Sequence, residues 1–501
     1  MKYSIFLIVA PLAAAFTIPM LGTYLPRLSK LIAALMLLAG TALSAWLLTA
    51  YKAQTVIVIG GWMPPFGISL HVDLLSLISV TAVYGATLMA TLYQLFDGQE
   101  KKPYFYMLIL LLTAALNGMI LTGDLFNLFV FMEIAGISSY ALIASGNGAA
   151  GVRGALKYMI VASLASVAYL AAIAIIYSTA GSLNMATVAS GMRDLNPVVG
   201  ALVVLLILAS VFTEMEIFPF NSWVPSAYQG APSSVSALLS GAVTVAAAYV
   251  ALRMSYIVFG QGMGDIIRYG KFNVTNILFW LGVITVITGQ AAAYAQADAK
   301  KMLALSSVAQ MGIILFAISI ASDLAIYGIV FAVIAHSLSK LLLFMVTGKF
   351  VSASGTSHWA KWKGLGRENP LSGGLFLIGA LGILGIPLFA GFWGKFSIIG
   401  AAFKAPGVSW IGVYIILAAT VVEAVYFFRL AHLLFEEPET KPVSIKSSIW
   451  FRISTALLAA AIIGIGVYPA PIDKKVRKIP TELSSKNTEG YISTAYRAMG
   501  R

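Results

Sequence analysis

The sequence predicts an all-α membrane protein with about fourteen transmembrane helices. Of its 501 residues, 60% are hydrophobic and only 10% are charged, and the mean hydropathy is +0.91. Soluble globular chains carry about 25% charged residues. The apolar runs are also too long for the strands of a membrane barrel, which need only about ten residues each. The chain is therefore expected to cross a membrane many times as helices.

Fourteen apolar segments follow one another along the chain. Their approximate bounds are 3–21, 31–50, 73–96, 104–122, 125–145, 154–178, 197–218, 233–259, 274–294, 302–321, 324–348, 371–391, 409–431 and 449–469. Each is long enough for a membrane helix. The first lacks a convincing small-residue cleavage site and the second follows closely, so we interpret it as a helix rather than a signal peptide.

Two of the segments, the seventh and the twelfth, are broken by proline. The seventh runs into FPFNSWVPSAYQGAP, with Pro219, Pro225 and Pro232, and the twelfth contains Pro387. A proline inside a helix removes a hydrogen bond and clashes with the preceding turn. Interrupted helices five segments apart indicate an inverted repeat. We therefore expect four regions: N-terminal helices (1–103), a first five-helix repeat (104–260), a second (261–435), and helix fourteen with a basic tail (436–501).

The charges of the loops predict how the chain is oriented in the membrane. The loops after odd-numbered segments carry Arg27, Lys30, Lys101, Lys102, Arg153, Lys300, Lys301, Lys361, Lys363, Arg367, Lys441 and Lys446. The opposite loops carry Lys2, Lys52, Arg193, Arg268, Lys271 and Lys404. Cytoplasmic loops are enriched in lysine and arginine. Both termini are therefore expected outside the cytoplasm, although the basic C-terminal tail argues for the opposite orientation.

Composition excludes several classes of site. With no cysteine, the chain has no disulfide, thiolate metal site or cysteine-ligated iron–sulfur cluster. Four histidines argue against a histidine-rich metal or haem site, so we expect no cofactor and no metal. The net charge of +13 comes mostly from loops. No basic run is interleaved with stacking aromatic residues, so nucleic-acid binding is not expected.

Ionisable residues nevertheless lie within the apolar segments. They are Glu133, Lys157, Glu214, Glu216, His336, Lys340, Lys395 and Glu423. A charge at the centre of a bilayer costs roughly 2.5–3.5 kcal/mol even on lenient scales. Such a residue is therefore retained where it pairs with another group, contacts water or has a function. A series of such groups through the interior is typical of a proton or cation path.

Five stretches, in order along the chain, carry a family resemblance. They are GDLFNLFVFMEI (123–134), WVPSAYQGAPSSVSALLSG (223–241), KKMLALSSVAQMG (300–312), AHSLSKLLLF (335–344) and GIPLFAGFWGK (385–395). The chain resembles the antiporter-like subunits shared by respiratory complex I, the multisubunit Mrp Na+/H+ antiporters and the membrane-bound hydrogenases. The residues of the first two stretches are most similar to those of the D subunit of the Mrp antiporters and of its hydrogenase counterpart.

The resemblance implies a fold and a function. It implies fourteen helices, two inverted repeats with broken helices seven and twelve, and movement of H+ and/or Na+ along a central polar axis. It also implies neighbouring membrane subunits, a prokaryotic cell membrane and its lipid bilayer, and no redox cofactor in this chain. Glu133 matches the family's essential glutamate, and Lys157 on the next helix is placed to pair with it. Lys395 matches the terminal charged residue of the path.

Helix seven departs from the family pattern. Glu214 stands where the family carries a lysine, and Val245 stands where helix eight carries another. Two interpretations follow. In one, the first half is inactive and serves as scaffold or coupling element. In the other, Glu133, Thr213, Glu214 and Thr244 form an oxygen-rich cation site that suits Na+. Glu216 lies about 200° around a helix from Glu214, so Glu214 is expected to be the inward residue.

The second half keeps more of the pattern. His336 and Lys340 are four residues apart and share a helix face, so together they could relay a proton. Glu423 is expected to find its partner on another helix. The sequence thus predicts an ion-translocating, antiporter-like subunit. Two alternatives stay open: a structural or coupling subunit without transport, and a stand-alone transporter of a small organic solute.

Overall fold

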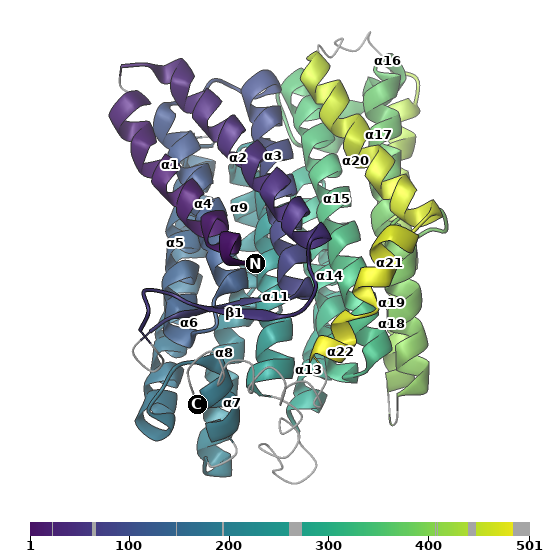
Figure 1. Ribbon diagram of the computed structural model, residues 1–501. Helices are drawn as coiled ribbons and strands as arrows, with labels where there is room; N and C mark the ends of the chain where they lie inside the picture. The colour runs from purple at the N-terminus through teal and green to yellow at the C-terminus, as the bar shows by residue number, and fades with distance from the viewer. Residues whose placement is uncertain are drawn as a thin grey trace.

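The computed structural model is a single bundle of long helices (Figure 1). It describes residues 1–22, 24–62, 67–146, 148–192, 195–259, 273–405, 407, 409–438 and 447–483. The C-terminal residues 484–501 lie outside the described residues. So do five of the residues on which the predicted orientation rests, namely Arg193, Arg268, Lys271, Lys441 and Lys446.

In chain order, the elements fall into two groups. The first group is η1 (Lys2–Ile5), α1 (Phe6–Gly22), α2 (Pro26–Thr49), β1 (Thr55–Val58), β2 (Ser69–Val72), α3 (Leu74–Asp97), α4 (Pro103–Leu121), α5 (Leu125–Ala144), α6 (Gly148–Ala180), α7 (Met185–Gly191), α8 (Pro197–Glu214), α9 (Val224–Gly230), α10 (Ser233–Leu238), η3 (Leu239–Val243), α11 (Thr244–Arg253) and η4 (Met254–Val258). The second group is α13 (Val274–Tyr294), α14 (Ala299–Ile320), α15 (Asp323–Ser354), η5 (Trp359–Trp362), α16 (Leu365–Glu368), α17 (Pro370–Leu384), α18 (Gly391–Lys404), α19 (Ser409–Phe435), α20 (Ile449–Val467), α21 (Ala470–Val476) and α22 (Ile479–Leu483).

Thirteen helices of the described chain are long and apolar enough to cross a membrane. One of them is the continuous run Ser233–Val258, which joins α10, η3, α11 and η4 and contains two π-helical turns. The predicted twelfth segment is α17, which is shorter and continues after a break as α18. The prediction of a many-helix membrane fold with breaks in the seventh and twelfth segments is confirmed. The inverted repeat and the region boundaries stay predictions.

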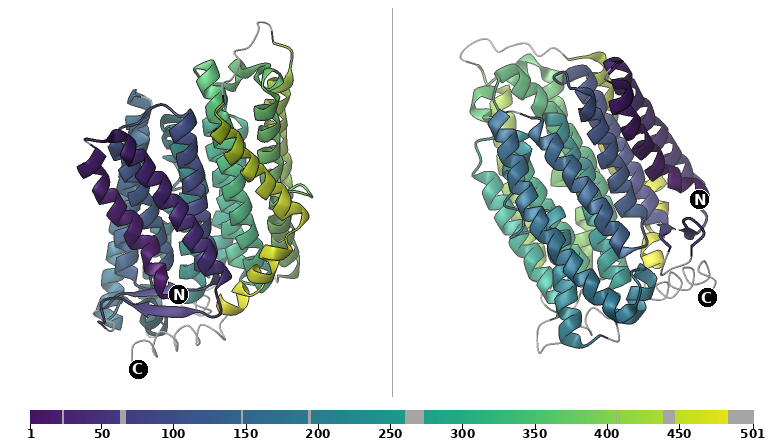
Figure 2. Two further views of the ribbon diagram at one scale, coloured as in Figure 1. Left: turned by 45° about the horizontal axis from the view of Figure 1, so that its top comes forward. Right: turned by 90° about the vertical axis from the view of Figure 1, so that its left-hand side faces the viewer.

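Burial separates the centre of the bundle from its outside. The run Ser233–Val258 is buried along its whole apolar window, and α14 along 94% of it. In contrast, only 33% of the apolar window is buried in Lys2–Gly22 (η1 and α1) and in α6. The outer helices flank the central ones in two groups, residues 1–230 on one side and 274–467 mostly on the other (Figure 2). The most buried helices therefore lie where the two groups meet, and they carry many of the buried polar residues.

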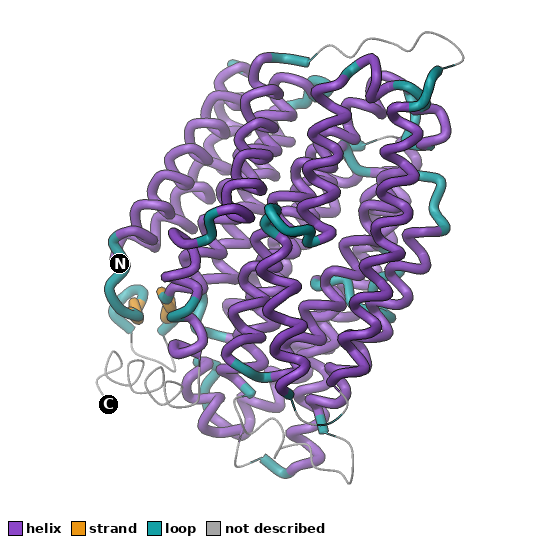
Figure 3. Tube along the Cα trace, turned by 90° about the vertical axis from the view of Figure 1, so that its right-hand side faces the viewer, coloured by secondary structure: helices purple, strands orange, loops and turns teal. Residues whose placement is uncertain are grey.

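The two ends of the bundle differ. One end, the hairpin face, carries the antiparallel pair β1–β2 (Figure 1, Figure 3). The helices α7, α21 and α22 lie toward the same end (Figure 1). The other end, the basic-loop face, carries α16 and the turn between α3 and α4 (Figure 1). The N-terminus and α22 both lie toward the hairpin face (Figure 2).

A short C-terminal segment, α21 and α22, is fastened to the hairpin face; we call it the C-terminal clasp. The Glu482 carboxylate accepts hydrogen bonds from the Tyr51 hydroxyl at 2.8 Å and from the Leu74 N–H at 3.1 Å. The Tyr327 hydroxyl donates to Asp473 at 2.6 Å. The clasp thus connects α3 of the N-terminal helices with α15 of the second half.

Candidate functional site

The break in helix seven leaves two glutamates inside the bundle. α8 ends at Glu214, and Glu216 has a φ of 62°, in the left-handed region. The Ile217 N–H donates to the Phe212 carbonyl at 2.9 Å. A left-handed residue with this hydrogen bond closes a helix, at a position usually taken by glycine. The expectation that Glu214 alone points inwards assumed a continuous helix. Because the helix ends there, both carboxylates are buried, Glu214 at 9% and Glu216 at 1% exposure.

Each of these glutamates accepts a hydrogen bond from a buried tyrosine. The Tyr158 hydroxyl donates to Glu214 at 2.7 Å, and the Tyr228 hydroxyl donates to Glu216 at 2.5 Å. The Tyr158 ring stacks on Trp223, with the ring centroids 3.6 Å apart and the planes at 6°. A buried carboxylate is tolerated when hydrogen bonds replace its lost hydration. Two tyrosine–glutamate pairs therefore lie at the break in helix seven.

Ser240 connects the first half with the second. It lies in the π-helical turn η3. Its Oγ is 2.8 Å from the Oγ of Ser307 on α14 and 3.4 Å from Nε2 of His336 on α15. The other histidine nitrogen, Nδ1, is buried without a hydrogen-bond partner among the described residues. Such π-turns are frequent at functional sites.

Lys340 lies one turn beyond His336 and is fully buried. Its Nζ donates to the Leu303 carbonyl at 2.7 Å and to the hydroxyl of Ser306, both on α14. No carboxylate of the described chain is within ion-pair distance. The carboxylates whose negative charges act on it are those of Glu423 and Glu216. His336 and Lys340 are thus buried together on α15, as their spacing predicts, and a relay through them stays a prediction.

A buried ion pair lies next to the second break. Lys395 on α18 and Glu423 on α19 approach to 3.0 Å, with side chains 9% and 0% exposed. The Gln310 amide donates to both oxygens of Glu423, at 2.8 and 2.9 Å. Lys395 also donates to the Leu384 carbonyl, at the end of α17, at 3.1 Å. The partner of Glu423 therefore does lie on another helix, as expected, and these contacts hold the two parts of the broken helix together.

Glu133 and Lys157 are not paired with each other. Glu133 is half-buried on α5, and its carboxylate accepts a hydrogen bond from Ser166 on α6. Lys157 is exposed on α6 and donates to Ser226 at 3.3 Å. The expected ion pair is therefore wrong, because Lys157 lies more than two helical turns from Ser166 and reaches toward α9.

The four residues of the predicted cation site do not converge through direct contacts. The Thr213 and Thr244 hydroxyls donate to carbonyls of their own helices, Ala209 at 3.0 Å and Ser240 at 2.5 Å. The Glu214 carboxylate accepts its hydrogen bond from Tyr158, and Glu133 is only half-buried on α5. The described residues contain no group of three or more acidic or histidine side chains that could hold a metal ion.

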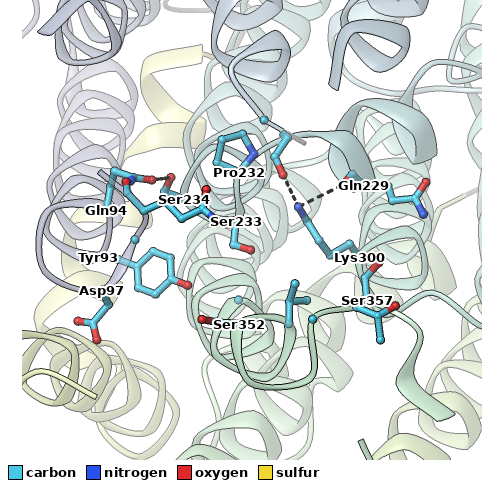
Figure 4. A pocket seen from close by; sticks show the side chains of 18 of the residues that line it. Tyr93, Gln94, Asp97, Gln229, Pro232, Ser233, Ser234, Lys300, Ser352 and Ser357 are labelled. Atoms are coloured by element: carbon cyan, nitrogen blue, oxygen red, sulfur yellow. Dashed lines mark hydrogen bonds between the residues drawn. The ribbon is translucent and has the colours of Figure 1, made fainter. Parts of the chain in front are cut away.

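A polar cavity of about 620 Å³ opens on the basic-loop face above the central helices. Its wall includes Gln94, Ser234, Lys300 and Ser357 (Figure 4). Lys300 is 3% exposed, and its ammonium donates to the carbonyls of Gln229 and Ala231 (Figure 4). The Lys300 side chain thus extends from α14 to the carbonyls at the end of α9. We call this cavity the vestibule.

A second polar cluster lies at the hairpin face. Arg253, at the end of α11, is 2% exposed and forms an ion pair with the Asp73 carboxylate. Asp73 caps α3 by accepting from the Ser76 N–H at 2.7 Å. The cluster closes this end of the central helices, whereas the vestibule opens the other end.

Several buried polar residues of the candidate site were not identified from the sequence. They are Tyr158, Tyr228, Ser240, Ser306, Ser307 and Gln310, all on buried faces. They are uncharged at neutral pH, so a search for charged residues passes over them. The signal that could have found most of them was their place in the stretches 223–241 and 300–312, which hold hydroxyl and amide groups within apolar sequence.

Comparison with known proteins decides the family. The family described as "NADH:quinone oxidoreductase/Mrp antiporter, TM" matches residues 122–422, more than half of the chain. The chain belongs to this family. The match begins just before α5 and ends next to Glu423, so it contains nearly all of the buried polar axis.

Individual members of the family are similar over most of the chain. The N subunit of NADH-quinone oxidoreductase from Desulforudis audaxviator is 35% identical over 379 residues, 74% of each chain. The D subunit of the Na(+)/H(+) antiporter from Alkalihalophilus pseudofirmus is 34% identical over 353 residues, 70% of each chain. The structure is also similar to a chain of a membrane-bound sulfane sulfur reductase, an archaeal respiratory membrane complex. That chain is 32% identical, with a TM-score of 0.90 over 99% of this chain and 100% of the other.

Proposed function

We propose that this member of the family is an ion-translocating subunit of a multisubunit membrane complex of the Mrp antiporter, membrane-bound hydrogenase or complex I type. The observation that carries the proposal is the buried series of ionisable groups across the bundle. It runs from Glu214 and Glu216 through His336 and Lys340 to the Lys395–Glu423 pair. Buried charges at bilayer depth are costly and typically mark ion or proton pathways.

Protons are the ion that these groups suit best. Histidine, lysine and carboxylate side chains exchange protons, and the hydroxyls of Ser240, Ser306 and Ser307 can donate and accept hydrogen bonds between them. Protons would move through His336, Lys340 and Lys395 in the second half. The vestibule would give water access to the axis from the basic-loop face, and the positive-inside rule assigns that face to the cytoplasm of a prokaryotic cell.

Neighbouring subunits would bind next to α5 and α6. Glu133 lies there among exposed apolar side chains of α5, Phe126, Val130 and Ile137. A carboxylate in an apolar surface at membrane depth is stabilised when another polar chain covers it. Glu133 and Lys157 would then carry communication with the neighbour, each through its own contacts rather than as a pair.

A structural or coupling role without transport is the second candidate. Glu214 and Val245 stand in the positions where the resemblance implies lysines, which favours an inactive first half. In that case Glu214 and Glu216 would be static, held by their tyrosines.

Transport in everted membrane vesicles that contain the complete complex tests the proposal. The pH gradient is followed with a fluorescent amine, and Lys340→Ala and Glu133→Ala are compared with the wild type. Each variant is expected to abolish coupled transport and leave assembly intact. Lys361→Ala, at an exposed lysine of η5 on the same face as the vestibule, is the matched control and should transport normally. Assembled Lys340→Ala complexes with unchanged transport would contradict the proposal.

The Glu214→Lys variant tests whether the subunit carries Na+. If Na+-dependent collapse of the pH gradient is lost while assembly is kept, Glu214 belongs to a cation path and the subunit carries sodium. Unchanged or improved exchange would place the ion path around Lys340 and Lys395.

A further inference from the structure

We propose that the vestibule is a binding site for a phosphate group, which either an anionic lipid headgroup or a free phosphate compound would supply. The proposal goes beyond ion transport and does not depend on it. Three features of the described residues carry it: a polar cavity of about 620 Å³, hydroxyl groups that face this cavity without a partner, and a predominance of positive charge in its wall. A cavity of this volume is within the usual range of small-molecule sites.

Three hydroxyl groups from three helices face the vestibule. They belong to Tyr93 on α3, Ser233 at the start of the run Ser233–Val258, and Ser352 on α15, and Figure 4 shows their oxygens pointing toward a common space. None of the three side chains makes a hydrogen bond to another described residue. Tyr93 is only 4% exposed, and a buried hydroxyl without a partner is costly. A ligand that accepts hydrogen bonds in the vestibule would satisfy it.

Glycine allows these hydroxyls to come together. A Cβ added to Gly348 on α15 would overlap the hydroxyl oxygen of Tyr93 and the Cβ of Ser233. The helix α3 and the start of the run Ser233–Val258 therefore meet over a residue of α15 that has no side chain. Gly348 thus leaves room for the Tyr93 hydroxyl beside Ser233.

Two lysines bring positive charge to the wall of the vestibule. They are Lys300 on α14 and Lys101 in the turn between α3 and α4. The Lys101 ammonium donates to the Ser145 carbonyl at 2.7 Å, and the Lys300 ammonium donates to two carbonyls. Because an ammonium group has three N–H donors, each lysine keeps at least one for a ligand.

The single carboxylate among the described residues of the wall is compensated. Asp97, at the end of α3, forms an ion pair with Lys349 and accepts from the Ser448 N–H at 3.0 Å. In Figure 4 its carboxylate points away from the three hydroxyls. A hard metal cation would need several oxygen ligands, carboxylates above all. The wall therefore favours an anion over a metal ion.

Phosphate is the anion that fits these donors. Its several oxygens can accept hydrogen bonds from hydroxyl and ammonium groups at the same time. The first N–H groups of a helix also bind phosphate. The 26-residue run Ser233–Val258 starts at the vestibule, and the residue before it, Pro232, offers no side-chain cap for these groups.

The vestibule lies at the level of lipid headgroups. Next to Asp97, the exposed rings of Phe96 and Trp450 stack with their centroids 5.2 Å apart. Such aromatic residues are enriched at the interface between membrane and water. The phosphate of an anionic lipid is therefore at the right depth to enter the vestibule, and a free phosphate compound would reach it from the water.

Phosphate binding to the purified, detergent-solubilised complex tests the site. Radiolabelled inorganic phosphate is the probe, and equilibrium dialysis measures its affinity. The wild type is expected to bind it. Tyr93→Phe and Lys300→Gln should each weaken binding by about tenfold or more, the usual effect of losing a hydrogen bond to a charged group. If Lys300→Gln lowers assembly, Lys101→Gln removes the other cation of the wall and is measured in the same way.

Melting temperatures without and with phosphate add a readout that a structural hydroxyl would not give. Because the Tyr93 hydroxyl has no protein partner, Tyr93→Phe should melt like the wild type without phosphate and gain less from added phosphate. Tyr84→Phe, the matched control, should show the opposite. Its hydroxyl donates to the Leu7 carbonyl at 2.8 Å, so this variant should melt earlier and bind phosphate normally. Lys361→Gln controls for charge, because Lys361 is exposed on the same face but outside the wall.

Nanodiscs distinguish the two sources of phosphate. The complex is placed in phosphatidylcholine alone or in phosphatidylcholine with phosphatidylglycerol. If a lipid headgroup is the ligand, phosphatidylglycerol should raise the melting temperature of the wild type but not that of Tyr93→Phe. If a free compound is the ligand, phosphatidylglycerol should have no effect, whereas inorganic phosphate still binds. Either result supports a phosphate site.

Two results would overturn the inference. One is a wild type that neither binds inorganic phosphate nor responds to phosphatidylglycerol. The other is binding that Tyr93→Phe, Lys300→Gln and Lys361→Gln all keep at wild-type affinity. Both would leave the proposed ion translocation standing, because Lys340→Ala tests that function by transport. Conversely, normal transport in Lys340→Ala would leave the phosphate site standing.

Discussion

At the level of single residues, the buried charges differ in how they are compensated. Glu423 has both a cation and an amide, because Lys395 and Gln310 bond its two oxygens. Lys340 has the Leu303 carbonyl and the Ser306 hydroxyl as its hydrogen-bond acceptors, which are neutral. The first arrangement stabilises a fixed charge. The second leaves a cation able to respond to charges that arrive at Glu216 or Glu423.

The Lys395–Glu423 pair should behave as a coupled unit in stability measurements. Lys395→Met leaves a fully buried carboxylate without its cation, and we expect a loss of about 3–5 kcal/mol. Adding Glu423→Gln should restore much of that loss, because no unpaired charge then remains. Thermal unfolding of the purified complex measures both. Equal melting temperatures for Lys395→Met and the double variant would show that the two residues are not coupled in this way.

The positions of these charges are readable from the sequence, but their partners are not. Glu133, Lys340 and Glu423 are conspicuous because a charge inside an apolar run is rare. Gln310 lies 113 residues before Glu423, and nothing local in either segment indicates that they meet. The expected Glu133–Lys157 pair failed for the same reason: adjacency of two helices does not fix which turn of one faces which turn of the other.

At the level of elements, close helix packing depends on glycine. An added Cβ at Gly282 on α13 would lie 2.6 Å from the backbone nitrogen of Phe316 and 3.0 Å from the carbonyl oxygen of Gly312, both on α14. Backbone atoms cannot turn away as a flexible side chain can. This pair of helices therefore approaches as closely as it does because glycine lies between them.

Gly282→Ala should destabilise the complex by about 1–3 kcal/mol, the usual cost of overpacking a well-packed interface. Gly85→Ala is the matched control, because Gly85 lies within α3 and an added Cβ there meets nothing within 4 Å. This control should be neutral or slightly stabilising, since alanine favours helix more than glycine does. Thermal unfolding of the two variants side by side checks the difference. A Gly282→Ala variant as stable as Gly85→Ala would contradict the packing argument.

The C-terminal clasp should respond to pH. Burial raises the pKa of Glu482, and the nearby Asp73 carboxylate raises it further, while the hydrogen bonds from Tyr51 and Leu74 and the charge of Arg253 oppose the shift. The docked clasp therefore binds a proton more tightly than the released one. Docking should strengthen as the pH falls from above the raised pKa toward the usual carboxyl range, and it should be weakest at alkaline pH.

Hydrogen–deuterium exchange of residues 479–483 in the purified complex measures this effect. After correction for the intrinsic pH dependence of exchange, protection should be greater in weakly acidic than in alkaline buffer. Glu482→Gln should remove the difference, because its amide does not titrate. Protection that increases with pH in the wild type would contradict the assigned sign.

The helix breaks show which features of an element the sequence can predict. Pro219 and Pro387 locate both interruptions, because proline cannot continue the hydrogen-bond pattern of a helix. The path of the chain between the half-helices is a different matter. Glu216 takes a left-handed conformation that its own side chain disfavours, and the surrounding packing determines it. Helical periodicity therefore could not place Glu216.

At the level of the whole molecule, the fold was predictable because each apolar run is long and clearly bounded. The centre of the bundle was less predictable. The run Ser233–Val258 and α14 are buried almost throughout, so no exposed polar face indicates which neighbours they have. Their central place follows from the packing of the complete chain.

The orientation of the molecule can be measured directly because the chain has no cysteine. Lys361→Cys lies on the basic-loop face and Lys478→Cys in the C-terminal clasp on the hairpin face, and both positions are exposed. A membrane-impermeant thiol reagent should label Lys361→Cys in everted vesicles and Lys478→Cys in right-side-out vesicles. Vesicles permeabilised with detergent should label at both positions. The reverse pattern would place the hairpin face, with the N-terminus, in the cytoplasm.

The half-buried position of Glu133 has a consequence for how a cell makes this protein. A newly inserted copy, before any neighbour covers α5 and α6, holds a carboxylate against acyl chains at a cost of several kcal/mol. A copy without its partner subunits thus exposes the Glu133 carboxylate to lipid, whereas an assembled copy covers it. Membrane proteases and insertion factors can distinguish the two. Glu133 would then also help to match the supply of this chain to that of its partners.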